Sequence, residues 1–171
     1  MMNNYCTENK LHVFKLNAPQ KATLMKKSKT ILLAEDNPRD AELTLEAIAG
    51  CSLPNQVTVV RDGVEAIEYL YYEGKYKSRK KENPVVLLLD IKMPRMDGIE
   101  VLQAIRTDPA LKTLPVVMLT SSREKTDLKR SYELGANAYV VKPVNFAEYK
   151  ETIKNVGKFW AVINELPLPE D

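Results

Sequence analysis

A chain of 171 residues is close to the ~150 residues expected for one domain, and its net charge of +2 is too small to indicate nucleic-acid binding. No apolar run approaches the ~18 residues of a membrane helix, and the first 28 residues contain no apolar segment typical of a secretory signal. The single histidine and the two widely spaced cysteines exclude most zinc sites and most histidine-dependent catalysis. We therefore expect a cytoplasmic protein without a membrane or nucleic-acid partner.

The chain begins with residues 1–28, which show no sustained apolar periodicity and are interpreted as a mobile N-terminal extension. A short apolar run then predicts a strand at 30–34, and a helix is predicted at 38–50. Asn37 is a candidate N-cap of this helix and Gly50 a candidate C-cap, so the helix has a recognisable start and end.

Beyond Gly50, apolar runs of strand length continue to alternate with segments of helical periodicity. In chain order, we predict a strand at 57–60, a helix opening at 62–63, a polar loop at 75–83, a strand at 85–89, a helix at 98–106, a strand at 116–119, a helix at 123–134, a strand at 138–141 and a helix at 145–164. The unbroken apolar run at 85–89 is typical of a strand buried on both faces. The alternation predicts an α/β fold with a parallel sheet covered by helices on both faces.

Polar side chains follow four of these strands at the point where each strand ends. They are Glu35 and Asp36 after the first strand, Asp90 after the third, Thr120 after the fourth and Lys142 after the fifth. The carboxyl ends of parallel strands open on one edge of a sheet, so three carboxylates should converge there with a hydroxyl and an ammonium. Their mutual repulsion would be offset by the lysine and by a divalent cation. Carboxylate oxygens suit Mg²⁺, so the cluster predicts a Mg²⁺ site that handles a phosphoryl group.

The expected position of each side chain indicates its role. Asp90 is central and is the candidate nucleophile, because carboxylates can form aspartyl-phosphates. Glu35 and Asp36 are expected to hold Mg²⁺, which neutralises charge on phosphoryl oxygens. Lys142 would pair with one phosphoryl oxygen as a point charge, and Thr120 would hydrogen-bond another.

The motifs around these residues resemble the receiver domain of two-component response regulators. They are Glu35-Asp36-Asn37, Leu89-Asp90-Ile91-Lys92-Met93-Pro94, Met96-Asp97-Gly98, Leu119-Thr120-Ser121 and Val141-Lys142-Pro143. The resemblance covers residues 29–157, which leaves 158–171 as the end of the last helix and a tail. It implies a flavodoxin-like (βα)5 fold, in which a doubly wound five-stranded parallel sheet has the order 2-1-3-4-5.

The resemblance also implies how such a protein works. A sensor histidine kinase would phosphorylate Asp90, with the backbone carbonyl of Lys92 as a further ligand of Mg²⁺, for which Mn²⁺ can substitute. Tyr139 would couple to Thr120 as a conformational switch, and a cis peptide is expected at Lys142-Pro143. The protein would be a signalling switch rather than an enzyme, although its own groups would assist phosphoryl transfer and autodephosphorylation. It would act on a downstream protein or a phosphotransfer target.

The subgroup that this chain resembles most is the single-domain receivers that pair with bacterial and cyanobacterial phytochromes. The loop at 71–76 and the segments at 159–160 and 165–169 are similar to theirs, so a phytochrome-like photoreceptor is one candidate kinase. The far end of the last helix should overhang the sheet. We therefore expect a homodimer or output face that includes Tyr132, Phe159 and Trp160.

Four other functions are weighed against this interpretation. A phosphatase with an aspartyl nucleophile would carry a second Asp where Lys92 stands. A phosphorylation-independent scaffold would be expected to have lost part of the site. A dinucleotide-binding domain would need a Gly-rich turn at 34–37, and a DNA-binding regulator would need a helix-turn-helix segment after the receiver.

Overall fold

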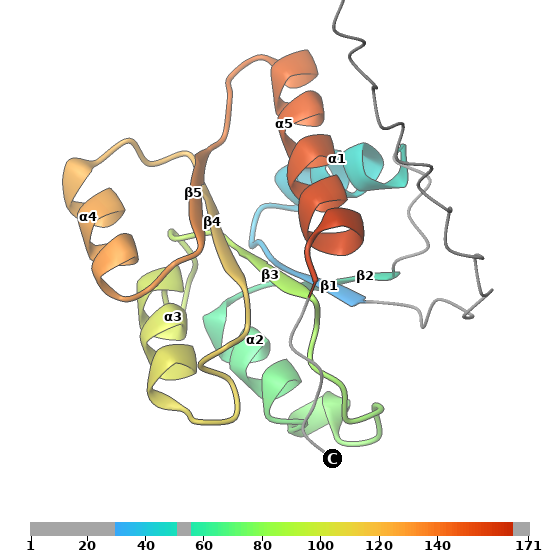
Figure 1. The fold of residues 1–171 in the computed structure, drawn as a ribbon, viewed down its shortest axis with the longest axis vertical. Coiled ribbons are helices and arrows are strands. Elements are labelled where there is room, and N and C mark those ends of the chain that lie inside the picture. The colour runs from blue at the N-terminus through green and yellow to red at the C-terminus, as the bar shows by residue number, and fades with distance from the viewer. Residues whose placement is uncertain (1–29, 51–55, 166–171) are drawn as a thin grey trace, which may run out of the picture.

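The computed structural model describes residues 30–50 and 56–165, which form a central sheet between two sets of helices (Figure 1). The predicted extension at 1–28 and the end of the tail lie outside these ranges. The elements in chain order are β1 (Thr30–Ala34), α1 (Pro38–Ala49), β2 (Gln56–Val60), α2 (Gly63–Leu70), the 3-10 helix η1 (Gly74–Tyr76), β3 (Val86–Leu89), α3 (Gly98–Thr107), β4 (Val116–Thr120), α4 (Lys125–Glu133), β5 (Ala138–Val141), α5 (Phe146–Lys158) and the π-helical turn η2 (Phe159–Ile163). No helix in the described ranges is both long and apolar enough to cross a membrane.

The five strands form one parallel sheet in the order β2-β1-β3-β4-β5, so the predicted topology is confirmed. β1 lies between β2 and β3 and pairs with both. Leu33, for example, lies opposite Val59 on one side and Leu88 on the other. Because the strands are parallel, their carboxyl ends open on the same edge of the sheet, where ligand sites of this fold are found.

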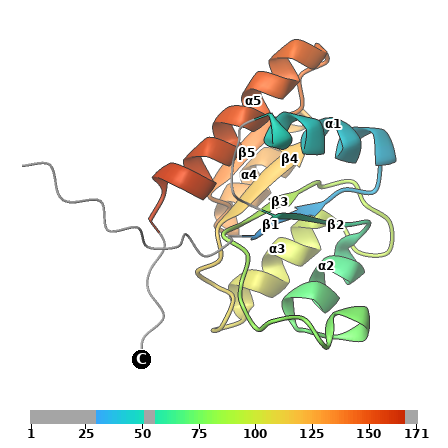
Figure 2. The ribbon, with the colours of Figure 1, turned by 90° about the vertical axis from the view of Figure 1, so that its right-hand side faces the viewer.

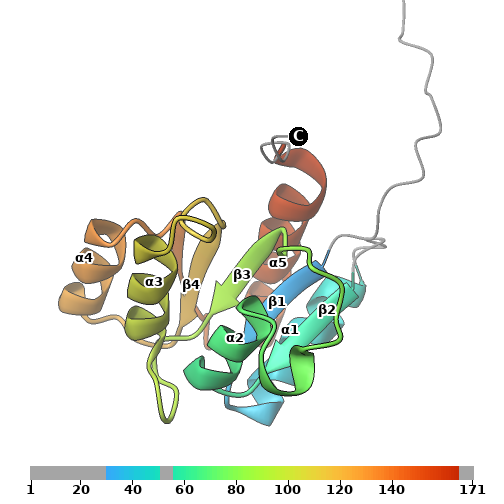
Figure 3. The same cartoon turned by 90° about the horizontal axis from the view of Figure 1, so that it is seen from below.

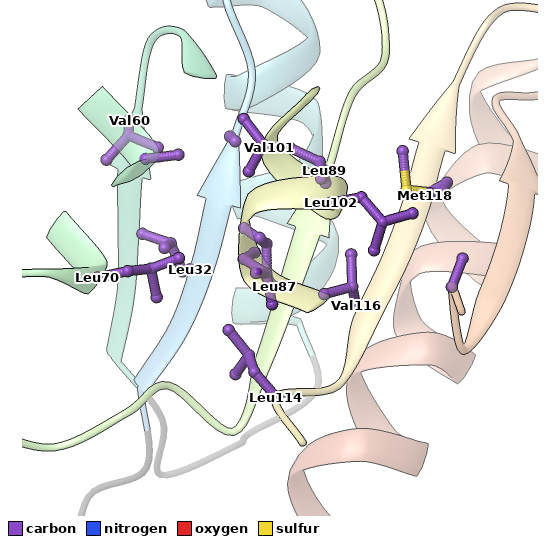
Figure 4. Close-up of a cluster of buried hydrophobic side chains, with 14 of the residues drawn as sticks. Leu32, Val60, Leu70, Leu87, Leu89, Val101, Leu102, Leu114, Val116 and Met118 are labelled. Atoms are coloured by element: carbon purple, nitrogen blue, oxygen red, sulfur yellow. The ribbon is translucent and has the colours of Figure 1, made fainter. Parts of the chain in front are cut away.

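Each face of the sheet buries its own apolar cluster. α1 and α5 pack together on one face, while α2, α3 and α4 cover the other (Figure 2). α3 and α4 lie side by side next to β4 (Figure 3). Successive side chains of a strand point to opposite faces, so Leu87 and Leu89 join the cluster beneath α2 and α3 (Figure 4), whereas Val86 and Leu88 join the one beneath α1 and α5. β3 is thus buried on both faces, as its unbroken apolar run predicts.

Capping side chains explain where several helices begin. Asn37 accepts a hydrogen bond from the backbone N–H of Arg39 at the start of α1. Asp97 and Glu100 form a reciprocal capping box at the start of α3. Gly50 follows the last residue of α1, so both predicted ends of that helix are confirmed.

Two helices differ from their predicted extent by more than one residue. α4 begins at Lys125 rather than at residue 123. The last helix, predicted to run to residue 164, is α-helical only to Lys158 and continues as the π-helical turn η2. The N–H of Asn164 donates to the carbonyl of Phe159 (2.7 Å), which is the wider bonding pattern of a π-helix.

The segment after α2 is the polar, mostly exposed loop that its composition predicts, apart from the 3-10 helix η1 at its start, and one arginine anchors it. The guanidinium of Arg79 lies 3.9 Å from the ring centre of Tyr69 and 4.1 Å from that of Tyr72. Its Nε and Nη2 also donate to the carbonyl of Tyr69, at 3.0 and 2.9 Å. A guanidinium can contact aromatic rings while it hydrogen-bonds backbone, so Arg79 fixes this loop against the end of α2.

Candidate functional site

Asp90 lies directly after β3, at the edge where the strands end. Its backbone N–H donates to the carbonyl of Ala34 at the end of β1 (3.0 Å), and its Oδ1 accepts from the N–H of Ile91 (2.7 Å). The residue is only 6% exposed. Two neighbouring strands therefore hold this carboxylate in a fixed position.

Gly98 allows helix α3 to begin close to Asp90. The N–H of Gly98 donates to the carbonyl of Ile91 (2.9 Å), and a Cβ atom at position 98 would lie only 2.1 Å from the carbonyl oxygen of Asp90. No side chain fits in that space. The glycine is thus required by the close approach of the helix to the loop that carries Asp90.

Glu35, Asp36 and Asp90 form an acidic cluster, as the strand ends predict. Each offers one carboxylate oxygen, and these oxygens lie within 4.8 Å of one another. Glu35 and Asp90 are buried, whereas Asp36 is exposed, so the cluster is open to solvent on one side. Three hard oxygen donors with access to water are the ligand set that Mg²⁺ and Mn²⁺ accept.

Lys142 reaches the cluster from the end of β5. Its Nζ lies 2.6 Å from Glu35 Oε2 and 3.1 Å from Asp90 Oδ2, and only 7% of its side chain is exposed. It also lies 2.9 Å from Oδ2 of Asp40, a residue that the sequence analysis missed. Asp40 belongs to the first turn of α1 rather than to a strand end. Its position one turn beyond Asp36, in a helix that starts at this edge, is the signal that could have identified it.

The charges in the site alter the pKa of two groups. Burial is the largest influence on Glu35 and raises its pKa to about 7, although the hydrogen bond and charge of Lys142 act in the opposite direction. Burial acts to lower the pKa of Lys142, but the charge of Asp90 and the hydrogen bond and charge of Glu35 together raise it above its ordinary value. The ammonium of Lys142 therefore stays charged. Its single positive charge does not balance the negative charges of the acidic cluster, so the site favours a further cation.

Thr120 and Tyr139, the predicted switch pair, both contact Ser122 in the loop after β4. Thr120 is fully buried, and its Oγ1 accepts from the N–H of Ser122 (3.1 Å). The half-buried Tyr139 donates its hydroxyl hydrogen to the carbonyl of Ser122 (3.1 Å). The structure thus brings the two predicted residues together through the backbone of one loop residue.

A second polar cluster joins the loop after β3 to helix α4. The exposed Lys92 places its Nζ 3.3 Å from Oδ2 of Asp127, and the hydroxyl of Ser122 donates to the same oxygen (2.9 Å). Asp127 was not predicted as a site residue, because nothing in a helix sequence shows which loop the helix faces.

The residues predicted for a dimer or output face lie in two places. Tyr132 is on α4 and is 52% exposed. Phe159 is 45% exposed at the end of the last helix, next to the half-buried Trp160, and the two rings meet edge to face at 5.0 Å. Part of Trp160 packs on the cluster beneath α1 and α5.

The prediction of a cis peptide at Lys142-Pro143 is wrong. The described residues contain no cis peptide bond. Here the N–H of Lys142 donates to the carbonyl of Thr120 (2.8 Å), and the ammonium reaches the acidic cluster with the bond in the trans form. The trans form is intrinsically favoured before proline by about 0.5–1 kcal/mol.

Comparison with known proteins places this geometry in a family. The sequence profile of the response regulator receiver domain matches residues 31–154. Response regulator Rcp1 from Synechocystis sp. is 35% identical over 139 residues, which cover 81% of this chain and 93% of Rcp1. The crystal structure of the Mn(2+)-bound form of Rcp1 matches with a TM-score of 0.76 over 82% of this chain and 99% of Rcp1, at 35% identity.

Two further solved structures are similar. The phosphorylated cyanobacterial phytochrome response regulator RcpA matches with a TM-score of 0.78 and 40% identity, over 83% of this chain and all of RcpA (100%). The bacteriophytochrome response regulator AtBRR is 55% identical with a TM-score of 0.66, over 81% of this chain and 99% of AtBRR. With the profile match, these similarities show that the chain belongs to the response regulator receiver family and has phytochrome-associated response regulators among its homologues.

Proposed function

We propose that this protein is a response regulator that accepts a phosphoryl group on Asp90 from a sensor histidine kinase in a Mg²⁺-dependent reaction. The observation that carries the proposal is the meeting of Asp90 with Glu35, Asp36 and Lys142 at one edge of the sheet. A buried carboxylate nucleophile, acidic metal ligands and a fixed ammonium are the groups that phosphoryl transfer to aspartate needs.

Glu35, Asp36 and Asp90 are the proposed side-chain ligands of Mg²⁺, with the backbone carbonyl of Lys92 as a fourth donor. Their clustered oxygens support this assignment, and the existence of a Mn(2+)-bound form of the relative Rcp1 supports Mn²⁺ as a substitute. The metal, when bound, would neutralise negative charge on the phosphoryl oxygens. The exposed Asp36 leaves the site open to the water molecules that Mg²⁺ retains.

The protein side chains then have distinct tasks in the transfer. An oxygen of Asp90 would attack phosphorus, so that a P–O bond forms while the P–N bond to the histidine of the kinase breaks and the imidazole nitrogen keeps the electron pair. Lys142, already 3.1 Å from Asp90 Oδ2, would bind a phosphoryl oxygen through a charge-assisted hydrogen bond. The Thr120 hydroxyl would donate to another. Attack of water on phosphorus would later restore the carboxylate.

The environment of Lys92 argues for a switch and against a phosphatase. A phosphatase with an aspartyl nucleophile would use an acid at this position to protonate the leaving group. Lys92 instead directs its ammonium to Asp127, and the pKa of Lys92 is raised by its hydrogen bond to that carboxylate. A lysine held in its charged form is a poor proton donor at neutral pH.

The signal would leave the site through the loop after β4. Movement of the Thr120 hydroxyl onto the phosphoryl group would free the N–H of Ser122, a residue whose carbonyl accepts the hydrogen bond from Tyr139. The change would alter α4 and the surface around Tyr132. That surface would contact a downstream protein or phosphotransfer target.

Further proposals concern assembly and context. Phe159 and Trp160, together with Tyr132, would contribute to a homodimer. A phytochrome-like photoreceptor is the proposed kinase, since RcpA is described as a phytochrome response regulator and AtBRR as a bacteriophytochrome response regulator. Such a pair would work in the cytoplasm.

The function is tested by incubating the protein with acetyl phosphate and Mg²⁺ and measuring its intact mass. Wild type should gain one phosphoryl group, whereas Asp90→Asn should gain none. Asp108→Asn is the matched control, because this residue lies at the far end of α3, and it should behave as wild type. Absence of an adduct on folded wild type, or an equal adduct on Asp90→Asn, would contradict the proposal.

A further inference from the structure

We propose that Asp40 is a positioning residue that holds the ammonium of Lys142 at the phosphoacceptor site, an inference that rests on the proposed function. The Oδ2 atom of Asp40 lies 2.9 Å from Lys142 Nζ, closer than Oδ2 of Asp90 at 3.1 Å. Glu35 Oε2 is nearer still at 2.6 Å, so Asp40 is the second closest of the three carboxylates around the lysine, although it comes from a helix and not from a strand end.

Lys142 has a separate carboxylate for each of its donors. An ammonium group carries three N–H bonds, and Glu35, Asp40 and Asp90 each lie within hydrogen-bond distance of it. Glu35 and Asp90 also belong to the cluster that would bind the metal, and Asp40 does not. When a metal and a phosphoryl group engage Glu35 and Asp90, Asp40 is the partner that can keep its contact with the lysine.

The backbone at Asp40 is fixed by a buried hydrogen-bond chain to α5. The hydroxyl of Thr44 donates to the carbonyl of Asp40 (2.8 Å), so the hydroxyl of Tyr149 must donate to Thr44 Oγ1 (2.6 Å). Thr44 is fully buried, and Tyr149 is 4% exposed. Lys142 lies in the short connection between β5 and α5, so the contact between α1 and α5 holds both Asp40 and the segment that carries Lys142.

The space beside the pair explains why the lysine needs such a partner. A cavity of about 280 Å³ opens next to Asp40 and Lys142, with Tyr149 and the 46%-exposed Phe146 in its wall. A lysine side chain has four rotatable bonds and could turn into this opening. Asp40 lies at the cavity and keeps the ammonium directed toward Asp90.

The inference is tested with trifluoroberyllate, which adds to an aspartate carboxylate with three fluorines in place of the phosphoryl oxygens. Wild type, Asp40→Ala, Asp40→Asn and Lys142→Ala are titrated at saturating Mg²⁺ and followed by ¹⁹F NMR. The control is Glu42→Ala, which removes an exposed carboxylate of the same helix. Loss of a nearby negative charge alone would strengthen binding of the anion, so a weakening reports on the position of the lysine.

We expect Asp40→Ala to weaken trifluoroberyllate binding about tenfold and to shift the fluorine resonance that Lys142→Ala also shifts. Asp40→Asn keeps an oxygen acceptor and should weaken binding less, while Glu42→Ala should match wild type. Asp40 variants that bind as wild type does, with an unchanged spectrum, would overturn the positioning role while the proposed function stands. A folded wild type that binds no trifluoroberyllate would overturn both.

Discussion

The hydroxyl of Tyr139 on β5 donates to the backbone carbonyl of Ser122, while the N–H of Ser122 donates to Thr120 Oγ1, each across 3.1 Å. One residue of the loop after β4 therefore links a buried threonine at the phosphoacceptor edge to a half-buried tyrosine on the outer strand. If the Thr120 hydroxyl moves, the N–H of Ser122 loses its acceptor. The carbonyl of Ser122 still accepts the hydrogen bond from Tyr139.

The first prediction concerns this link. Tyr139→Phe removes the hydroxyl but keeps the ring, so it should cost about 0.5–1.5 kcal/mol of stability and leave phosphoryl uptake by Asp90 near the wild-type level. Hydrogen exchange of the segment 121–134, with and without phosphorylation, should show a smaller phosphorylation-dependent change than in wild type. Tyr132→Phe, at an exposed tyrosine of α4, is the control and should show the full change. Equal changes in both variants would mean that the Tyr139 hydroxyl takes no part in the response.

The second prediction concerns pH. The pKa of Glu35 in the folded protein, about 7, lies above its ordinary value of 4.5, chiefly because of burial, so between these values the folded state binds a proton that the unfolded state has lost. The associated stability is complete below about pH 4.5 and is lost as pH rises to about 7, a fall on the order of 3 kcal/mol in the metal-free protein.

Urea unfolding of the metal-free protein at a series of pH values checks this window. Glu35→Gln should flatten the dependence, and saturating Mg²⁺ should flatten it too, because a bound cation favours the ionised carboxylate. Acids with a lowered pKa change the stability only below pH 4.5, outside the range from pH 4.5 to 7. Glu65 is one of them: burial acts to raise its pKa, but its hydrogen bonds with Lys75 and Arg61 lower it. Wild type whose stability rises between pH 5 and 7 would contradict the sign.

The third prediction concerns the glycine behind Asp90. Gly98→Ala would place a Cβ atom 2.1 Å from the carbonyl oxygen of Asp90, a contact that only backbone movement can relieve. The expected cost is about 1–3 kcal/mol, with slower phosphoryl uptake because Asp90 moves with its loop. Gly50→Ala is the matched control, since its nearest atoms would be 3.6 Å away and its backbone is already helical, so its stability should be unchanged or higher. Thermal unfolding and acetyl phosphate kinetics measure both variants, and equal behaviour of the two would show that the loop tolerates the side chain.

Much of this fold follows from short stretches of sequence. The five apolar runs are strands to within one residue of their predicted bounds, and Asn37 and Gly50 mark the two ends of α1. These features are local, because burial on two faces demands an unbroken apolar run and a helix end needs a partner for its free backbone groups. For the same reason, the sequence could predict that four side chains meet at one edge of the sheet, since parallel strands leave few places for their ends. They are Glu35, Asp36, Asp90 and Lys142.

Contacts between elements far apart in the chain were decided only by the tertiary structure. The pairing of Asp40 with Lys142 spans 102 positions and depends on how α1 packs against α5, and the partner of Lys92 depends on where α4 lies. The stacking of Arg79 on two tyrosines also depends on the surrounding structure rather than on residue type. The groups that stand at the edge of the sheet could be identified from the amino-acid sequence alone, because strand periodicity and chain direction are local properties. Which carboxylate each cation faces was decided by helix packing, because side-chain partners are set by the relative positions of whole elements in space.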